Sequence, residues 1–263
     1  MRKIVTAIAA LAIGLALSGP VMAEELTIVG TGDGVKTLKA IGAAFSNNNP
    51  GITVNVPKSI GSGGGIKAVG TDKYTIGRVA REIKEKEKHY GLTYVLFAKI
   101  PVVFFVNKAV GIQNLSAQQV CDIYSGKITN WKEVGGKDRK IRVVRREDGD
   151  SSLKVLLKLF PGFKDITITE KSKTVLKTSA NFTIVESKAD TIGFGPYDVA
   201  KGVNVDVLKI DGRLPTEPGY LSVGAMALIF KGKNKTGSIK KFVEFATSPA
   251  AHDAIKGAGA KPI

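Results

Sequence analysis

The sequence predicts an α/β fold with largely parallel sheets. Segments rich in β-branched and aromatic residues alternate with segments whose apolar residues have helical spacing, from residue 26 to residue 259. Several of the expected strands lead into helices through short glycine-rich loops. No low-complexity segment, linker or internal repeat breaks the alternation. Ligands bind such folds at the carboxyl ends of strands, so these loops are the places to look for function.

The first part of the chain shows the alternation clearly. The expected elements are, in order, a strand at 26–30, a helix at 35–48, a strand at 52–57, a helix at 66–70 that follows a glycine cluster, and a strand at 73–77. Residues 92–108 are rich in β-branched and aromatic side chains, and we expect two successive strands there with a kink at Pro101.

The second part continues in the same way. The expected elements are a helix at 116–127, a strand at 140–147, a helix at 151–160, a strand, turn and short helix at 191–202, a strand pair at 220–233 and a helical region at 238–259. Ser116 is the expected N-cap of the first of these helices and Gly126 its C-cap residue.

The N-terminal residues have the pattern of a secretory signal peptide. A basic start containing Arg2 and Lys3 precedes an apolar stretch, which ends in the small-residue pattern Val21-Met22-Ala23. We therefore expect cleavage after Ala23 and export of the chain. No later stretch is long and apolar enough to span a bilayer.

Composition limits the possible partners. The net charge of +16, of which Arg2 and Lys3 contribute two units, favours anionic partners. The basic residues are spread along the chain without an aromatic-interleaved stripe or a nucleic-acid-binding signature, so we do not expect nucleic acid. A single cysteine, Cys121, excludes an intramolecular disulfide. The two histidines, His89 and His252, lack metal-ligand spacing, so no metal or other cofactor is expected.

Three loop-to-helix junctions share one chemistry, at residues 30–36, 61–67 and 145–154. Each brings small residues to an expected helix start, where free backbone N–H groups favour anions. The hydroxyl groups and guanidinium groups there add further donors, from Ser62, Ser151, Ser152, Arg145 and Arg146. Together the three junctions predict a site for an oxyanion stripped of water.

Three stretches carry a specific resemblance: GSGGGIKA at 61–68, IYSGKITNWKEVGG at 123–136 and IGFGPYD at 192–198. The chain resembles the phosphate-binding proteins of bacterial phosphate ABC transporters over essentially its whole length after residue 23. The resemblance implies a type II periplasmic binding protein fold, in which two α/β lobes joined by two strand crossovers close on one oxyanion. The implied lobes are 24–99 with 223–263, and 100–222.

The resemblance also implies a set of phosphate-binding groups. These are the backbone N–H groups of Gly34 and Val35, the hydroxyl and N–H of Ser62, the guanidinium of Arg146, and the groups at Asp150, Ser151 and Ser152, where the family usually has Ser-Gly-Thr.

Two departures from the family bear on specificity. Asp150 places a carboxylate where a hydroxyl donor is expected, and a carboxylate repels phosphate unless it is protonated or turned away. Ala80 stands where some members have an aspartate that accepts the proton of hydrogen phosphate. One hypothesis is that Asp150 takes over this role. Arg81, the next residue, is expected either to add positive charge near the ligand or to point to solvent.

The function implied by the resemblance is a periplasmic, monomeric receptor. It binds inorganic phosphate and delivers it to an ABC transporter permease in the inner membrane. Two binding alternatives stay open: a receptor for sulfate, molybdate or arsenate, and a phosphate-responsive sensor that binds another protein. An enzyme such as a secreted phosphatase is disfavoured, because the sequence offers no carboxylate–histidine cluster for a metal or a poised nucleophile.

Overall fold

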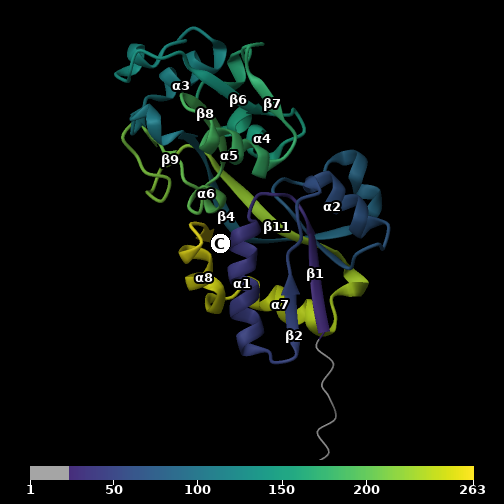
Figure 1. Ribbon diagram of the computed structural model, residues 1–263. Helices are drawn as coiled ribbons and strands as arrows, with labels where there is room; N and C mark the ends of the chain where they lie inside the picture. The colour runs from purple at the N-terminus through teal and green to yellow at the C-terminus, as the bar shows by residue number, and fades with distance from the viewer. Residues whose placement is uncertain (1–23) are drawn as a thin grey trace, which may run out of the picture.

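The computed structural model describes residues 24–263, so the predicted signal peptide lies outside the described residues. The chain forms two α/β lobes, and the strands β4 and β11 pass between them (Figure 1). The strands are β1 (Glu24–Gly30), β2 (Ile52–Asn55), β3 (Ile76–Val79), β4 (Leu92–Val106), β5 (Asn114–Leu115), β6 (Arg142–Arg146), β7 (Lys173–Val175), β8 (Thr191–Pro196), β9 (Asp206–Val207), β10 (Lys209–Ile210), β11 (Val223–Lys231) and β12 (Lys261–Pro262).

The helices connect these strands. They are α1 (Val35–Asn48), α2 (Gly61–Gly70), α3 (Ala117–Ser125), α4 (Ser151–Leu159), α5 (Thr178–Ser187), α6 (Tyr197–Ala200), α7 (Gly237–Ala246) and α8 (His252–Gly257). Short 3₁₀ turns lie at Glu85–Tyr90, Lys108–Val110, Trp131–Val134, Phe163–Asp165, Gly232–Asn234 and Pro249–Ala251.

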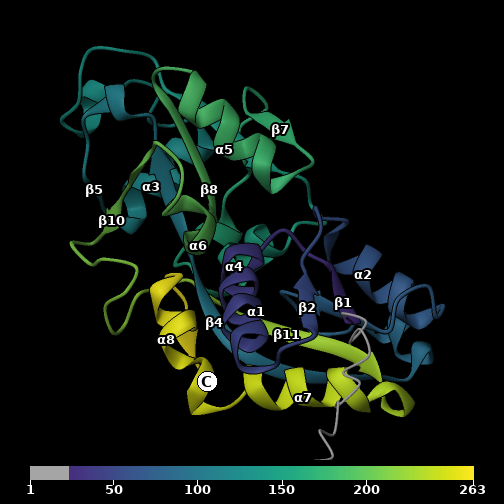
Figure 2. The ribbon, with the colours of Figure 1, turned by 60° about the horizontal axis from the view of Figure 1, so that its bottom comes forward.

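The first lobe is built on the parallel strands β2, β1 and β3, and β11 adds to β3 in the antiparallel direction. Helices α1, α7 and α8 cover one face of this sheet and α2 covers the other (Figure 2). The parallel arrangement places the ends of β1 and β3 at the same edge, next to the starts of α1 and α2.

The second lobe repeats the plan with β8, β6 and β7 as parallel neighbours. Strand β4 pairs with β11 in the first lobe and with β8 in the second, both times antiparallel. The prediction of largely parallel sheets is therefore correct within each lobe, and the antiparallel pairs occur at the two crossing strands.

The predicted division of residues 92–108 into two strands at Pro101 is wrong, because β4 is one strand of 15 residues. Pro101 pairs with Val223 at the end of the β11 ladder, and Val102 is the first residue paired with β8. The proline lacks an N–H group, and it sits where the strand changes partner, so the ladder continues past it.

The predicted strand pair at 220–233 is also wrong, because β11 is a single strand. Gly224 does not form a turn. A Cβ atom there would lie 2.9 Å from a methyl group of Val155 on α4, so the glycine allows that helix to lie close to the strand.

The glycine cluster was expected to precede a helix at 66–70. It instead forms the first turns of α2, which begins at Gly61. A Cβ atom on Gly65 would lie 2.8 Å from the Cα of Gly30, so this glycine lets α2 lie directly against the end of β1. The third predicted strand is displaced to Ile76–Val79, and the C-terminal helical region divides at Pro249–Ala251. Helix α5 is not predicted by the sequence pattern.

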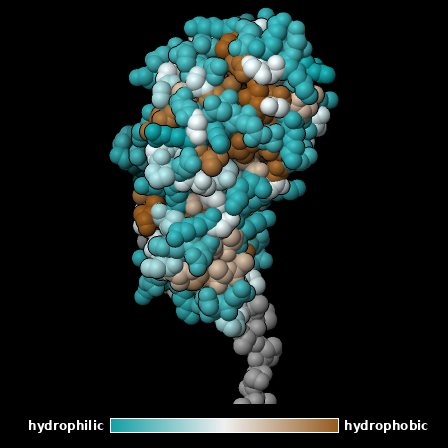
Figure 3. Space-filling model, turned by 90° about the vertical axis from the view of Figure 1, so that its left-hand side faces the viewer, coloured by the Kyte–Doolittle hydropathy of each residue, from teal (hydrophilic) through white to brown (hydrophobic). Residues whose placement is uncertain are grey.

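The apolar core is divided between the lobes. Ile100 packs with Phe97 and Met226 in the first lobe, whereas Val102 packs with Phe104 and other residues of the second. Ile100, assigned to the second lobe from sequence, thus belongs to the first. On the face shown in Figure 3, hydrophilic residues predominate and apolar patches lie mainly over the second lobe.

Candidate functional site

Three helix starts meet between the lobes. The hydroxyl of Ser62, at the start of α2, lies 3.0 Å from the hydroxyl of Ser151, at the start of α4. The Ser152 hydroxyl donates a hydrogen bond of 3.2 Å to the carboxylate of Asp33, in the loop before α1. The three junctions that the sequence singled out separately therefore come together, two from the first lobe and one from the second.

A cavity of ≈ 190 Å³ opens at this meeting point. Its lining comes from four segments, within 31–32, 59–62, 146–151 and 176–178. This space suits a small ion with a few water molecules, because a water in the liquid occupies about 30 Å³. The lining is mostly polar and contains hydroxyls and the Arg146 guanidinium, together with the carboxyl groups of Glu147 and Asp150.

Arg146, the last residue of β6, is held firmly in the wall of the cavity. Its buried guanidinium donates to the Thr178 hydroxyl at 2.8 Å and lies 3.0 Å from the Asp150 carboxylate. Its Nε group also donates to Glu147 at 3.0 Å and to the Val175 carbonyl at 3.2 Å. These contacts fix a planar, always charged donor group in one orientation.

Both carboxylate oxygens of Asp150 have partners within the protein. One oxygen accepts the Leu153 N–H at 2.9 Å, which makes Asp150 the N-cap of α4, and the other pairs with Arg146. Burial raises the pKa of Asp150, although Arg146 and the backbone N–H of Leu153 act in the opposite direction. The hypothesis that Asp150 accepts a ligand proton therefore competes with two existing contacts.

Asp33 is a buried carboxyl group that the sequence analysis did not single out. Ser152 donates to one of its oxygens, and the other has no hydrogen-bond partner among the residues that the structure describes. Burial, followed by the negative charge of Asp150, raises the pKa of Asp33 to about 8. The sequence held one signal for this residue, because Asp33 is an acidic residue inside a loop that was expected to bind an anion.

Ser62 links the first lobe to the cavity. Its hydroxyl accepts a hydrogen bond of 3.2 Å from the backbone N–H of Ala80, immediately after β3. Ala80 itself is buried. Arg78, on β3, donates to the carbonyls of Thr31 and Pro57, each at 2.8 Å, and thereby ties together the two first-lobe loops that line the cavity.

Arg81 does not reach this cavity. Both of its terminal nitrogens bond the Glu87 carboxylate at 2.7 Å, and one also donates to the carbonyl of Glu82 at 2.9 Å. The structure thus favours neither of the two expected positions, free in solvent or at the ligand, because a neighbouring acid holds the side chain.

Gly34 and Val35 lie beside the cavity without lining it. The Asp198 carboxylate of the second lobe reaches the start of α1, where it accepts both the backbone N–H and the hydroxyl of Thr37 at 3.2 Å. Burial raises the pKa of Asp198, although hydrogen bonds from Thr37 and from the backbone N–H of Gly34, the N-cap residue with a φ of 72°, act in the opposite direction. A carboxylate of the protein therefore lies at the start of α1, where backbone N–H groups were expected to bind the anion.

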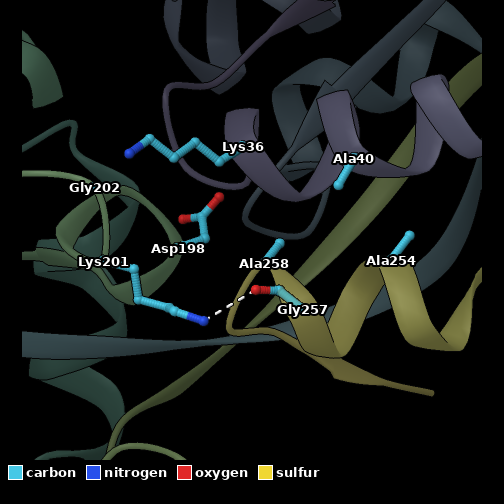
Figure 4. Close-up of a pocket in the computed structure, with 8 residues that line it drawn as sticks. All are labelled: Lys36, Ala40, Asp198, Lys201, Gly202, Ala254, Gly257 and Ala258. Carbon is cyan, nitrogen blue, oxygen red and sulfur yellow. Dashed lines mark hydrogen bonds between the residues drawn. The ribbon is translucent and has the colours of Figure 1, made fainter.

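Asp198 also faces a larger cavity of ≈ 500 Å³ between α1, α6 and α8 (Figure 4). Lys36 and Lys201 extend beside it, and Lys201 donates to the Gly257 carbonyl at 2.9 Å. Lys36, in the first junction, and Asp198, in the IGFGPYD stretch, are the lining residues that the sequence indicated, and the other lining residues carry none of that chemistry. We therefore assign the site to the smaller cavity.

Thr178 is a further site residue that the sequence did not reveal. It begins α5, lines the cavity and accepts the hydrogen bond of Arg146. A Cβ atom on Gly32 would lie 2.7 Å from its hydroxyl, which shows how closely the lobes approach here. No local motif marks this residue, because its place depends on the pairing of β6 with β7.

The fold and the site define a two-lobe binding protein with a small polar cavity between its lobes. The profile of the PBP superfamily domain matches residues 18–250. The chain belongs to this superfamily.

Individual relatives agree with this assignment. The chain is 25% identical over 231 residues to the phosphate-binding protein PstS of Borreliella burgdorferi, covering 81% of this chain and 80% of that one. It is 28% identical over 233 residues to PstS of Bacillus subtilis, covering 85% and 75% respectively.

A solved structure from Clostridium perfringens is also similar, a protein assigned as a phosphate ABC transporter substrate-binding protein with bound phosphate. Its TM-score is 0.80 at 27% identity, with 91% of this chain and 100% of that chain covered. The expected two-lobe type II fold is confirmed. No helix within residues 24–263 is long and apolar enough to cross a membrane.

Proposed function

We propose that this protein is an exported receptor that binds inorganic phosphate between its two lobes and delivers it to an ABC transporter. The observation that carries the proposal is the cavity between the lobes, where the buried Arg146 guanidinium and the hydroxyls of Ser62, Ser151 and Thr178 surround a space of ≈ 190 Å³. The relatives named above are phosphate-binding proteins rather than enzymes, in agreement with the sequence-based prediction.

The donor set suits a small tetrahedral oxyanion. A guanidinium offers paired N–H groups that match two oxygens of such an ion, and hydroxyls replace its lost water. The start of α2 has no side-chain cap, so its N–H groups add further donors with partial positive charge, whereas Asp150 already accepts the Leu153 N–H at the start of α4. Arg81 is not part of this donor set, because Glu87 holds its side chain and compensates its charge.

Closure of the lobes follows from where these donors lie. Ser62 belongs to the first lobe, whereas Arg146, Ser151 and Ser152 belong to the second. A ligand that bonds both sets stabilises the closed arrangement over an open one. The proposed lobes are those expected from sequence, 24–99 with 223–263, and 100–222, with Ile100 moved to the first.

The partner and location complete the proposal. We infer cleavage after Ala23, a monomeric protein in the periplasm, and delivery of phosphate to a permease in the inner membrane. The long strands β4 and β11 that join the lobes act as the hinge about which the receptor opens to release its ligand.

Calorimetric titration of the protein lacking residues 1–23 tests the proposal. Bound anion is first removed by unfolding and refolding, and phosphate, arsenate, sulfate and molybdate are then titrated separately. We expect tight binding of phosphate and arsenate. If sulfate or molybdate binds more tightly than phosphate, the protein is a receptor for another oxyanion, and if none of the four binds, the receptor function is wrong.

A further inference from the structure

A second cavity between the lobes adjoins the proposed phosphate site. Its volume is ≈ 450 Å³, and its lining comes from α1, the loop after β2, the start of α5 and α6. It shares Gly32, Ser59, Lys177 and Thr178 with the smaller cavity. Gly32 and Thr178 approach closely at this boundary, since a Cβ atom on the glycine would lie 2.7 Å from the threonine hydroxyl. Because the two residues belong to different lobes, a slight opening of the lobes connects the two cavities.

The charged side chains that line this second cavity are all lysines, and we call it the lysine cavity. They are Lys36, Lys39, Lys58 and Lys177. Within residues 24–263, none of their ammonium groups lies within 4.0 Å of a carboxylate oxygen. Lys36 donates to the Val199 carbonyl at 3.3 Å, which leaves its charge uncompensated. The lysine cavity therefore has an excess of positive charge.

The smaller cavity has a different balance of charge. Its guanidinium, on Arg146, already pairs with Asp150 and Glu147, and both of these acids also line the cavity. Its volume of ≈ 190 Å³ suits one small oxyanion. A second negative group bonded to that oxyanion is better placed in the lysine cavity, where unpaired positive charge lowers its electrostatic energy.

The lining of the lysine cavity also indicates what this second group is. It contains no aromatic ring on which a nucleobase could stack, and no carboxylate to accept hydrogen bonds from the hydroxyls of a sugar. Its uncharged polar side chains are the hydroxyls of Ser59, Thr178 and Ser179, which can donate to an oxyanion as the ammonium groups do. These features favour a second phosphoryl group over a nucleoside or a sugar.

We propose that the receptor also binds condensed phosphates such as inorganic pyrophosphate, with one phosphoryl group in the smaller cavity and the next in the lysine cavity. The proposal rests on the phosphate-binding function proposed above. The guanidinium of Arg146 and the hydroxyls of the smaller cavity hold the terminal group as they hold phosphate, and the ammonium groups offset the charge of the second group. Because the bridging oxygen passes between Gly32 and Thr178, the lobes close less fully on pyrophosphate than on phosphate.

The test titrates the stripped protein lacking residues 1–23 with phosphate and with pyrophosphate, in the absence of divalent cations. We expect both ligands to bind. After the pyrophosphate titration the protein is separated from free ligand and unfolded, and the released ligand is identified by ion chromatography. This step is needed because phosphate formed by hydrolysis would otherwise be counted as bound pyrophosphate. If only phosphate is recovered, the proposal is overturned.

A double variant, Lys39→Gln with Lys58→Gln, separates the two cavities, because these exposed lysines line the lysine cavity and not the smaller one. It should bind pyrophosphate at least about fivefold more weakly, the effect of two exposed charged contacts, and phosphate as wild type does. Lys171→Gln with Lys173→Gln is the matched control, because it removes two exposed lysines that line a separate cavity of the second lobe.

The outcomes distinguish the proposal from the proposed function. If wild type binds phosphate but not pyrophosphate, the proposal is overturned and the proposed function stands. The same holds if the control variant loses as much affinity for pyrophosphate as the lysine-cavity variant, or if the latter loses none. If wild type does not bind phosphate, the proposed function is wrong.

Discussion

At the scale of single residues, the site depends on side chains whose hydrogen-bond partners fix them before a ligand arrives. Arg146 is the clearest case, because Thr178, Asp150 and Glu147 all contact its guanidinium. A donor held in one orientation loses little conformational entropy on binding, so its hydrogen bonds contribute more to affinity. Because these contacts need the planar guanidinium, phosphate affinity should fall even when Arg146 is replaced by another positively charged residue.

Arg146→Lys is expected to weaken phosphate binding by roughly 10- to 100-fold, the effect of losing one charged hydrogen bond at about 1.5–3 kcal/mol. Lysine keeps the positive charge near Asp150 but loses the planar pair of N–H groups. Calorimetry with phosphate at pH 7.5 measures the change. Arg139→Lys, which alters an exposed arginine of the same lobe, is the control. Equal loss in both variants, or no loss in either, would contradict a specific role for Arg146.

The residue types of the site were predictable, but their orientations were not. The junction loops of α/β folds meet at strand ends, so one cavity is lined by Ser62, Arg146, Asp150 and Ser151. Arg81 was one of the residues considered as a source of positive charge near the ligand, yet Glu87 holds it away from the cavity. That pairing, like the contact of Asp198 with α1, depends on tertiary neighbours that no local pattern records.

At the scale of elements, the start of α2 shows why glycines gather in one helix. Gly65 lies against the backbone of Gly30 with no room for a side chain. Gly63 is exposed, and a Cβ atom there would come no closer than 3.6 Å to any neighbour. The two glycines therefore have different reasons to be there, and only one is required by packing.

This difference predicts opposite effects of alanine on stability. Gly63→Ala should raise the free energy of unfolding by about 0.5–1 kcal/mol, because alanine is the better helix former. Gly65→Ala should lower it by roughly 1–3 kcal/mol, because α2 must move away from β1. Urea unfolding of the ligand-free proteins measures both.

Phosphate affinity gives an independent check on the same pair. Movement of α2 displaces Ser62, so Gly65→Ala should also bind phosphate more weakly, whereas Gly63→Ala should not. Equal stability of the two variants would show that the helix relaxes without strain. If Gly63→Ala alone lost affinity for phosphate, the packing of α2 against β1 would not explain the loss, and the prediction would be wrong.

Element types were predicted better than their ends. The helix at 116–127 has a strong local signal, and Ser116 and Gly126 do cap it. Strands β4 and β11 were each predicted as two strands, the first because of Pro101, and β11 contains Gly224, a residue type that weakens strand interiors. In this fold a change of pairing partner accommodates the proline and a closely packed helix accommodates the glycine, and both are tertiary facts.

At the scale of the whole molecule, the junction between the lobes concentrates buried acids. Asp33, Asp150 and Asp198 all lie there, and burial is the largest cause of the raised pKa of each. They remain buried because both lobes contribute to their surroundings. Closing the lobes without a ligand thus removes three carboxyl groups from water, which makes the ligand-free closed state sensitive to pH.

The direction of this effect follows from proton binding. In the unfolded chain these acids lose their protons near the ordinary value of 3.8, whereas in the folded protein they hold them to higher pH, about 8 for Asp33. The folded state binds more protons between these values, so stability is greatest at the acidic end of the interval and falls as pH rises. Acids with lowered pKa, such as Asp72 and Asp138, act oppositely but are fully ionised above about pH 5.

We therefore expect the Tm of the ligand-free protein to fall by several degrees between pH 5.5 and pH 8, since each kcal/mol shifts Tm by roughly 2–4 °C in a chain of this size. Asp33→Asn should flatten the fall, because the amide has no proton to lose. Thermal unfolding followed by circular dichroism at several pH values measures both proteins. A Tm that rises over this range, or an equal slope in the variant, would mean that solvent reaches Asp33 because the ligand-free lobes stand open.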